Sequence, residues 1–162
     1  MQLGTDEQLQ RALELGYAYL NRRDRTVSEV RLQLQRKGIS PQLTEAAIQT
    51  LSDQALLDDT RFAQLFVSDK RQLEQWGNER IMRGLISRGI DRDLAATALG
   101  PDATDDDEGD AELQRALALL RRRFPQPPQD RRDRDRALGV LLRKGYESEL
   151  ALDALAAHAR GD

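Results

Sequence analysis

The sequence is short of the side chains on which most catalytic and metal sites depend. Among its 162 residues there is no cysteine, there is one histidine, His158, and aromatic residues make up 4%. Disulfides and thiolate-bound metals are therefore excluded, and a single histidine gives no reason to expect a zinc site. Because aromatic residues are so few, any core must be built mostly from Leu, Ile, Val and Ala.

Long apolar runs are missing as well. No segment approaches the roughly 18 uninterrupted apolar residues of a transmembrane helix. The first ten residues, MQLGTDEQLQ, lack the basic start and the apolar run of a signal peptide. We therefore expect a soluble cytoplasmic protein without membrane contact. The net charge of −3 and the pI of 5.3 argue mildly against DNA as the main partner, because strong nonspecific binding to phosphates usually needs a basic chain.

One short phrase occurs three times along the chain. It reads LQRKGIS at 34–40, LISRGID at 85–91 and LLRKGYE at 141–147. The glycines that align the phrases, Gly38, Gly89 and Gly145, are nearly evenly spaced, and such a recurrence indicates a repeat protein.

The first copy shows what each repeat contains. Apolar residues recur at helical spacing over 9–20. The segment TVSE at 26–29 is a capping box ahead of a second helix, which ends at Gly38, a residue that can take the left-handed conformation. Ser40 and Pro41 then supply the N-cap and the first-turn proline of a third helix.

The same three-part pattern follows twice more, and no run alternates with the period of two that a β-sheet needs. We therefore predict an all-α protein of nine helices. They form three tandem three-helix repeats of helix-turn-helix type, at 1–53, 54–100 and 111–162, with an acidic linker at 101–110. Because such small units are chained in a row, the molecule should be elongated and curved.

The acidic residues show no catalytic pattern. Asp58 and Asp59, close to Arg61, could suggest a metal site or an acid–base pair, but a helix N-cap with a dipole-stabilising neighbour explains them better. The run DDDE at 105–108 fits a solvated linker. His158 is expected at the surface or half-buried, and no phosphate-binding glycine loop or serine elbow is present. We predict that the protein is not an enzyme and uses no cofactor.

Arginine clusters are the remaining signal. They lie at 22–25, 121–123 and 131–136, and in the last of these the arginines alternate with aspartates that offset the local field. A solvated helix face explains them in the simplest way. The functional interpretation is an anionic partner, because the forked guanidinium meets carboxylate or phosphate with two hydrogen bonds.

These pieces together resemble the RecX family of recombinase regulators over residues 8 to 157. The most specific element is ALLDDTRFAQLF at 55–66, which is similar to a family signature of the form G-L/Y-L-D-D-x-R-F-A. It is supported by NRRDRTVSEVRLQLQRKG at 21–38, RIMRGLISRGID at 80–91 and LLRKGYESEL at 141–150. Gly84 departs from the family pattern, which usually has Glu at this position, and EQWGNERI, with Trp76, replaces a glycine-rich approach to the helix.

The resemblance implies a regulator of recombination and DNA repair that acts in the SOS response. It implies binding to the RecA recombinase, especially to its filament on single-stranded DNA, and inhibition of the ATPase, coprotease and strand-exchange activities. From charge and repeat position we predict the partner-binding residues Arg22, Arg23, Arg25, Arg31, Arg36, Lys37, Arg80, Arg83, Arg88, Arg132, Arg136, Arg143 and Lys144.

Three alternatives remain, and the most remote, an uncharacterised hydrolase, is disfavoured because the residues for catalysis are missing. A helix-turn-helix DNA-binding protein is the first, because three-helix units with a short turn between the last two helices resemble that motif. A helical scaffold for a different protein partner is the second. We expect a monomer, with at most weak direct contact to DNA.

Overall fold

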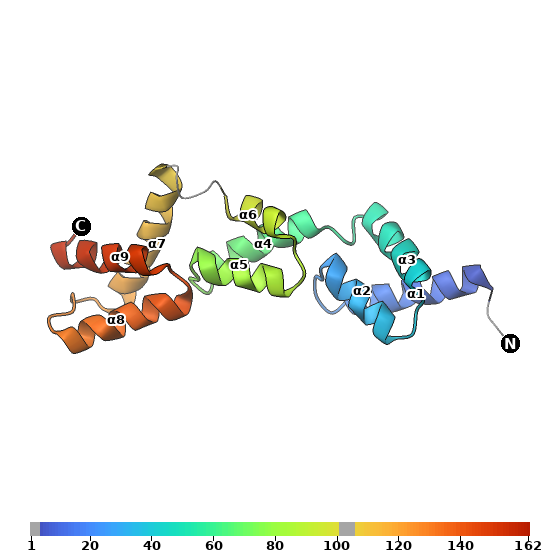
Figure 1. The fold of residues 1–162 in the computed structure, drawn as a ribbon, viewed down its shortest axis with the longest axis horizontal. Coiled ribbons are helices and arrows are strands. Elements are labelled where there is room, and N and C mark those ends of the chain that lie inside the picture. Colours follow the sequence, from blue (N-terminus) through green and yellow to red (C-terminus); the bar gives the residue numbers. More distant parts are fainter. Residues whose placement is uncertain (1–3, 101–105) are drawn as a thin grey trace.

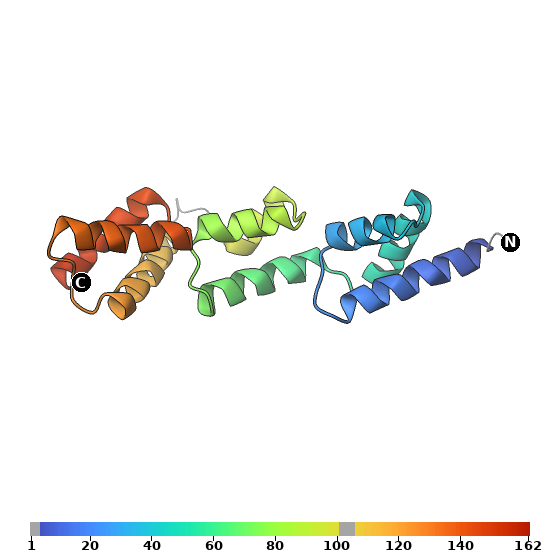
Figure 2. The same ribbon diagram turned by 90° about the horizontal axis from the view of Figure 1, so that it is seen from below.

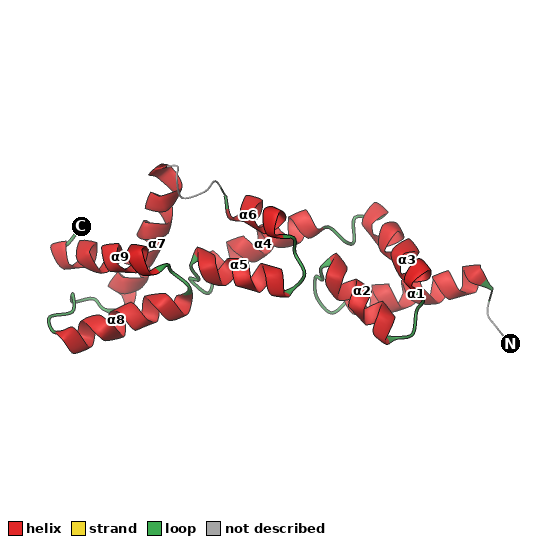
Figure 3. Cartoon of the chain, viewed as in Figure 1, coloured by secondary structure: helices red, strands yellow, loops and turns green. Residues whose placement is uncertain are grey.

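The fold was analysed in a computed structural model, which describes residues 4–100 and 106–162. Within these residues the chain forms nine helices and no strand (Figures 1 and 3), so the predicted all-α class is confirmed. The helices are α1 (Thr5–Leu20), α2 (Val27–Arg36), α3 (Pro41–Asp53), α4 (Asp59–Gln72), α5 (Asn78–Ser87), α6 (Arg92–Leu99), α7 (Asp106–Arg123), α8 (Arg131–Lys144) and α9 (Ser148–Arg160).

The helices group in threes around separate small cores. The buried residues of α1–α3, of α4–α6 and of α7–α9 form one cluster each. Most members are aliphatic, and Tyr146 in the third cluster is the exception with an aromatic ring. Because each repeat encloses its own core, the repeats follow one another in a row, and the two chain ends lie at opposite ends of an elongated molecule (Figure 1).

The local signals in the sequence determine where the helices begin. Thr26 and Glu29 form the predicted capping box of α2, with both reciprocal hydrogen bonds present. The Ser40 hydroxyl accepts from the Leu43 N–H at the start of α3, and Asp58 accepts from the Arg61 N–H at the start of α4. These contacts confirm the predicted N-caps.

The three repeated glycines end the middle helices α2, α5 and α8. All three have positive φ: +80° at Gly38, +82° at Gly89 and +94° at Gly145. Glycine takes this left-handed conformation without the steric cost that a Cβ brings. The recurring phrase therefore specifies the turn between the second and third helix of every repeat.

The start of α7 differs from the prediction. This helix begins at Asp106, inside the stretch expected to be an acidic linker, whose residues 101–105 lie outside the described part of the chain. The difference has a physical reason, because acidic residues favour the positive end of a helix dipole. The acidity that suggests a solvated linker is equally suited to a helical first turn.

Candidate partner-binding surface

The middle helices of the three repeats follow one another along the molecule. In Figure 2, α8, α5 and α2 form one row, and they run in the same direction. The last turn of α8 therefore meets the start of α5, and the last turn of α5 meets the start of α2. This order places the negative end of one helix dipole against the positive end of the next, which is a favourable arrangement.

The first joint, between α5 and α2, consists of Thr26, Val27 and Ser28 against Asp59, Arg88 and Gly89. The Thr26 hydroxyl, in a fully buried side chain, donates to the Arg88 carbonyl at 2.6 Å. The Val27 N–H donates to the Asp59 carboxylate at 2.9 Å. A Cβ on Gly89 would lie 2.2 Å from the Cβ of Ser28. Only glycine allows the two repeats to approach this closely.

The second joint, between α8 and α5, repeats this construction. The Gly77 N–H donates to the Lys144 carbonyl at 2.8 Å, and the Asn78 N–H donates to the Glu112 carboxylate at 2.9 Å. A Cβ on Gly145 would lie 2.2 Å from the Cβ of Arg80. In both joints the carbonyl just before a left-handed glycine thus accepts a hydrogen bond from the first turn of the neighbouring middle helix.

Further hydrogen bonds surround the second joint. The Lys144 ammonium donates to the Glu74 carbonyl at 2.7 Å, the Tyr146 hydroxyl to the Gln75 carbonyl at 3.1 Å, and the Arg80 guanidinium to the Arg143 carbonyl at 3.0 Å. Burial raises the pKa of the Tyr146 hydroxyl to about 12, so it stays a donor at every physiological pH. The second and third repeats are therefore held in a defined relative orientation.

The carboxylates of the two joints occupy equivalent positions. Asp59 and Glu112 each lie four residues before a fully buried alanine of the first helix of their repeat, Ala63 and Ala116. Burial is the main influence on both and raises the pKa of each carboxyl, while the backbone N–H that it accepts lowers it. Sequence reasoning missed this role for Asp59 and Glu112, although the shared offset from alanine is a signal in the sequence.

The structure divides the predicted partner-binding residues into two groups. The exposed group consists of Arg22, Arg23, Arg36, Lys37, Arg83, Arg132, Arg136 and Arg143, and the half-buried group of Arg25, Arg31, Arg80, Arg88 and Lys144. The second joint brings together members from two repeats, Arg80 with Arg143 and Lys144, which sequence position alone does not suggest.

Several of these residues have intramolecular partners. Arg25 lies 3.9 Å above the centroid of the Tyr19 ring, and Arg23 pairs with Glu29 at 3.0 Å. Arg31 meets Glu45 at 2.6 Å; this bond raises the pKa of the arginine and lowers that of the carboxyl. Exposed pairs of this kind contribute little to stability, so they can be exchanged for contacts with another molecule at small cost.

An aromatic groove lies on the second repeat, with Arg23 of the first repeat at its border, and sequence reasoning did not foresee it. It encloses about 420 Å³ and is lined by Arg23, Phe62, Phe66, Asp69, Lys70, Leu73, Glu74 and Arg88. At its edge Leu73 is 80% exposed. Lys70 lies 4.5 Å from the ring centroid of Trp76 and Arg88 lies 4.8 Å from that of Phe66. Aromatic residues and arginine are enriched in protein-binding hot spots, and the exposed leucine beside them adds apolar surface that a partner can bury.

Gly84 and Trp76, which depart from the family pattern, both lie beside Phe66, one of the side chains that line this groove. A Cβ on Gly84 would lie 2.9 Å from the Phe66 ring and 3.6 Å from the Trp76 ring. The two rings contact each other edge to face, with centroids 6.2 Å apart. Gly84 therefore provides the space that Phe66 and Trp76 occupy, which explains why a glycine is tolerated inside α5.

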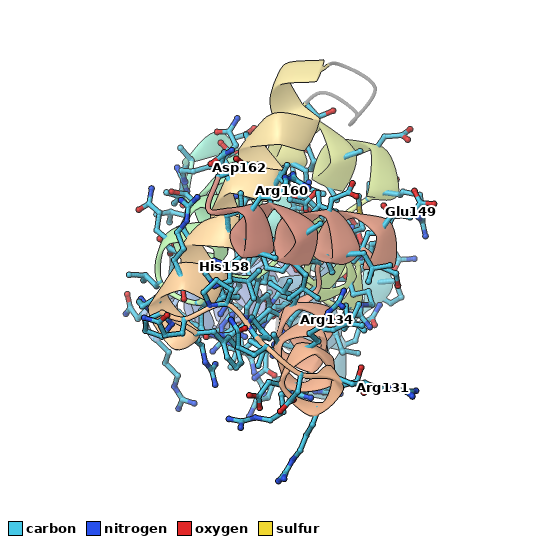
Figure 4. The ribbon with its side chains drawn as sticks, turned by 90° about the vertical axis from the view of Figure 1, so that its left-hand side faces the viewer. Arg131, Arg134, Glu149, His158, Arg160 and Asp162 are labelled. Atoms are coloured by element: carbon cyan, nitrogen blue, oxygen red, sulfur yellow. The ribbon has the colours of Figure 1, made fainter. Side chains whose placement is uncertain are left out.

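A basic hollow lies along α8 in the third repeat. This open depression has a volume of about 610 Å³ and is lined by Arg131, Arg132, Asp135, Arg136 and Arg143. Figure 4 looks at this end of the molecule and shows Arg131 and Arg134 on α8. The Arg131 side chain lies 4.0 Å from the Asp135 carboxylate but is 96% exposed. Its positive charge is therefore accessible from solvent.

Catalytic and metal chemistry finds no support in the described part of the chain. No group of three or more potential metal ligands occurs there. His158 on α9 is more buried than predicted, at 5% exposure, and its Nε2 lies 2.8 Å from the Phe124 carbonyl. It fastens the end of α7 to α9. Within the same residues, no helix is long and apolar enough to cross a membrane.

The fold defines the class of protein, which is an all-α row of three-helix repeats linked by two joints. Three family models match the chain. They describe the first, second and third three-helix domains of RecX and match residues 12–51, 58–99 and 110–155, respectively. The chain belongs to the RecX family.

Similar proteins support this assignment. The regulatory protein RecX of Amycolatopsis mediterranei is 30% identical over 152 residues, which cover 93% of this chain and 84% of that protein. RecX of Xanthomonas campestris pv. campestris is 34% identical over 140 residues, covering 86% and 80%. The crystal structure of RecX from Lactobacillus salivarius has the same fold, with a TM-score of 0.78 at 21% identity over 97% of this chain and 99% of that one.

Proposed function

We propose that this protein regulates recombination by binding RecA and its filament on single-stranded DNA, and that it inhibits the ATPase, coprotease and strand-exchange activities. It acts in the cytoplasm as a monomer and without catalysing a reaction. One observation carries the proposal: three middle helices stand in a row, and each carries more Arg and Lys than Asp and Glu. The chain as a whole has a net charge of −3, so the row is more positive than the chain as a whole.

A row of basic helices suits a partner that is itself a repeating array. Its basic side chains can meet acidic protein surface or phosphates at several neighbouring subunits. Each contact is weak, but the two joints keep the repeats in fixed order, so contacts made by one repeat raise the effective concentration of the next. A rigid row thereby binds a filament more tightly than it binds a single subunit.

The aromatic groove of the second repeat is the best candidate for the central anchor. Leu73 is 80% exposed beside Phe62 and Phe66, and burying such a side chain contributes about 1.5–3 kcal/mol. We expect Leu73→Ala to weaken binding to RecA filaments roughly tenfold or more. The matched control is Leu152→Ala, which removes a 52% exposed leucine from α9 and should leave the affinity unchanged.

The test uses RecA filaments assembled on immobilised single-stranded DNA with a non-hydrolysable ATP analogue, and it compares the dissociation constants of the two variants. If both variants bind as tightly as the unmodified protein, the groove is not the anchor. If the unmodified protein does not bind at all, the proposed function is wrong.

The alternative of a helix-turn-helix DNA-binding protein is less well supported. In that motif the last helix of the unit reads the major groove, usually with arginine or lysine. Here α3 has the sequence PQLTEAAIQTLSD, without a basic residue, and α6 carries only Arg92. Binding to DNA in the absence of RecA, with steep weakening as salt rises, would favour the alternative.

A further inference from the structure

The aromatic groove lies across the first joint. Most of its lining belongs to the second repeat, but Arg23 precedes α2 and belongs to the first. Arg88, which also lines the groove, provides the backbone carbonyl that accepts the hydrogen bond from the Thr26 hydroxyl. A molecule that fills the groove therefore contacts residues on both sides of this joint.

A continuous series of contacts connects the two arginines through the joint. The Arg23 guanidinium donates to the Glu29 carboxylate at 3.0 Å, and the other oxygen of this carboxylate accepts the Thr26 N–H at 2.9 Å. The Thr26 hydroxyl donates to the Arg88 carbonyl at 2.6 Å, and the Arg88 guanidinium lies 4.8 Å from the centroid of the Phe66 ring. Contiguous networks of this kind carry energetic coupling between sites.

The first joint is less strongly bonded than the second within the described residues. It is held by the hydrogen bonds that Thr26 and Val27 donate. The second joint has additional side-chain hydrogen bonds, which come from Lys144, Tyr146 and Arg80. A partner that bridges the first joint therefore acts at the point where the row of repeats opens most easily.

The end of the groove at the joint is cationic. Arg23 and Arg88 both line it. The ion pair between Arg23 and Glu29 is exposed on the arginine side, where the side chain is 49% accessible, and exposed pairs of this kind are weak. The two guanidinium groups are therefore suited to a carboxylate that a partner brings to the joint.

The rest of the groove is apolar along α4. Phe62 and Phe66 lie on this helix, and the exposed Leu73 follows its last residue. The remaining charged residues of the lining lie at the end of α4 or just beyond it: Asp69, Lys70 and Glu74. Lys70 pairs with Glu74 at 3.3 Å, so these two charges offset each other. This order of side chains fits a protein segment with an acidic residue followed by a bulky apolar one.

We propose that such a segment of the RecA filament docks in the groove and that its binding holds the first joint closed. Its carboxylate meets Arg23 and Arg88, and its apolar side chain packs against Phe62, Phe66 and Leu73. The inference rests on the proposed function and adds to it the chemistry of the partner and a coupling between binding and repeat arrangement. Because coupling is reciprocal, a substitution that opens the joint must also weaken binding in the groove.

The partner chemistry is tested on RecA filaments assembled on immobilised single-stranded DNA with a non-hydrolysable ATP analogue. Arg23→Ala should raise the dissociation constant roughly fivefold, because a charge-assisted hydrogen bond to the partner is lost. The matched control is Arg11→Ala, which removes the same charge from an exposed position on α1 outside the groove and should bind like the unmodified protein. Equal affinity of the two variants overturns the proposal. So does an equal loss for Arg23→Ala on bare single-stranded DNA, which would identify a phosphate as the occupant.

The coupling is tested by combining Arg23→Ala with Gly89→Ala, which forces the first joint apart. With the joint open, Arg23 no longer stands at the groove, so the double variant should bind no more weakly than Gly89→Ala alone. If Gly89→Ala lowers the helical content, Asp59→Ala takes its place. It removes only the acceptor of the Val27 N–H, and the loss in the double variant must again fall short of the sum of the single losses.

The outcomes separate this proposal from the proposed function. Additive losses in the double variants overturn the coupling, but they leave a protein that binds RecA filaments. If the unmodified protein does not bind the filaments at all, the proposed function is wrong, and the docking proposal fails with it.

Discussion

Replacing Gly89 with alanine should break the first joint, whereas replacing Gly38 should not. Both glycines end a middle helix, and their φ values are +82° and +80°. An alanine at either position therefore incurs the same left-handed strain, about 1–2 kcal/mol. The surroundings differ, since an added Cβ on Gly89 meets Ser28 at 2.2 Å, whereas one on Gly38 meets none of the described residues within 4 Å.

The expected magnitude follows from the contacts that must open. A carbon–carbon distance of 2.2 Å is far below contact distance, so the two repeats have to separate. The hydrogen bond from Thr26 to the Arg88 carbonyl is then lost, at about 1 kcal/mol, as is the bond from Val27 to the Asp59 carboxylate, at about 1.5–3 kcal/mol. Gly89→Ala should therefore cost about 3.5–6 kcal/mol, against about 1–2 kcal/mol for Gly38→Ala.

Urea unfolding followed by far-UV circular dichroism measures both losses. Repeat proteins unfold as coupled units, so Gly89→Ala should also split the transition and release one part of the chain at lower urea. Equal destabilisation by the two substitutions, with a single transition in both, would refute the claim that the joint couples the first and second repeats.

Further predictions concern a carboxyl, a hydroxyl and a surface charge. Burial raises the pKa of Glu112, so its carboxyl is protonated at a higher pH in the folded protein than in the unfolded chain. The unmodified protein should therefore gain stability relative to Glu112→Gln as the pH falls from 7 to 4. A difference in unfolding free energy between the two proteins that stays constant with pH, measured by urea unfolding, would contradict this. Among the described residues, the buried Thr44 hydroxyl has no hydrogen-bond partner, so Thr44→Val should stabilise the protein by about 1 kcal/mol, measured as a higher urea midpoint. Arg83 is exposed on α5, and Arg83→Glu should slow association with RecA filaments several-fold at low salt, an effect that must fade at high salt.

Local structure could be predicted from the sequence because its determinants are close together in the chain. The capping box at 26–29, the Ser40–Pro41 helix start and the left-handed glycines each need only a few consecutive residues. The segment that occurs three times in the sequence predicted the repeat architecture. The resemblance to RecX then supplied an expected function that no single residue suggests.

The joints could not be predicted, because they pair groups from different repeats. Thr26 shows the difference: its hydroxyl accepts from the Glu29 N–H within the capping box, and the same oxygen donates to the Arg88 carbonyl, 62 positions away. Only the first bond has a local signature. The aromatic groove was missed for a similar reason. In the sequence, Gly84 is only an unfavourable residue inside a helix, and the structure is needed to show that Phe66 and Trp76 occupy the space beside it.

The most direct test of the proposed function is the ATPase rate of RecA on single-stranded DNA, titrated with this protein at physiological salt. A regulator that binds along the filament should inhibit well below one molecule per RecA subunit, and the Leu73→Ala variant should require roughly tenfold more protein for the same inhibition. An unchanged rate with a cognate RecA, even with the protein in excess, would contradict the account.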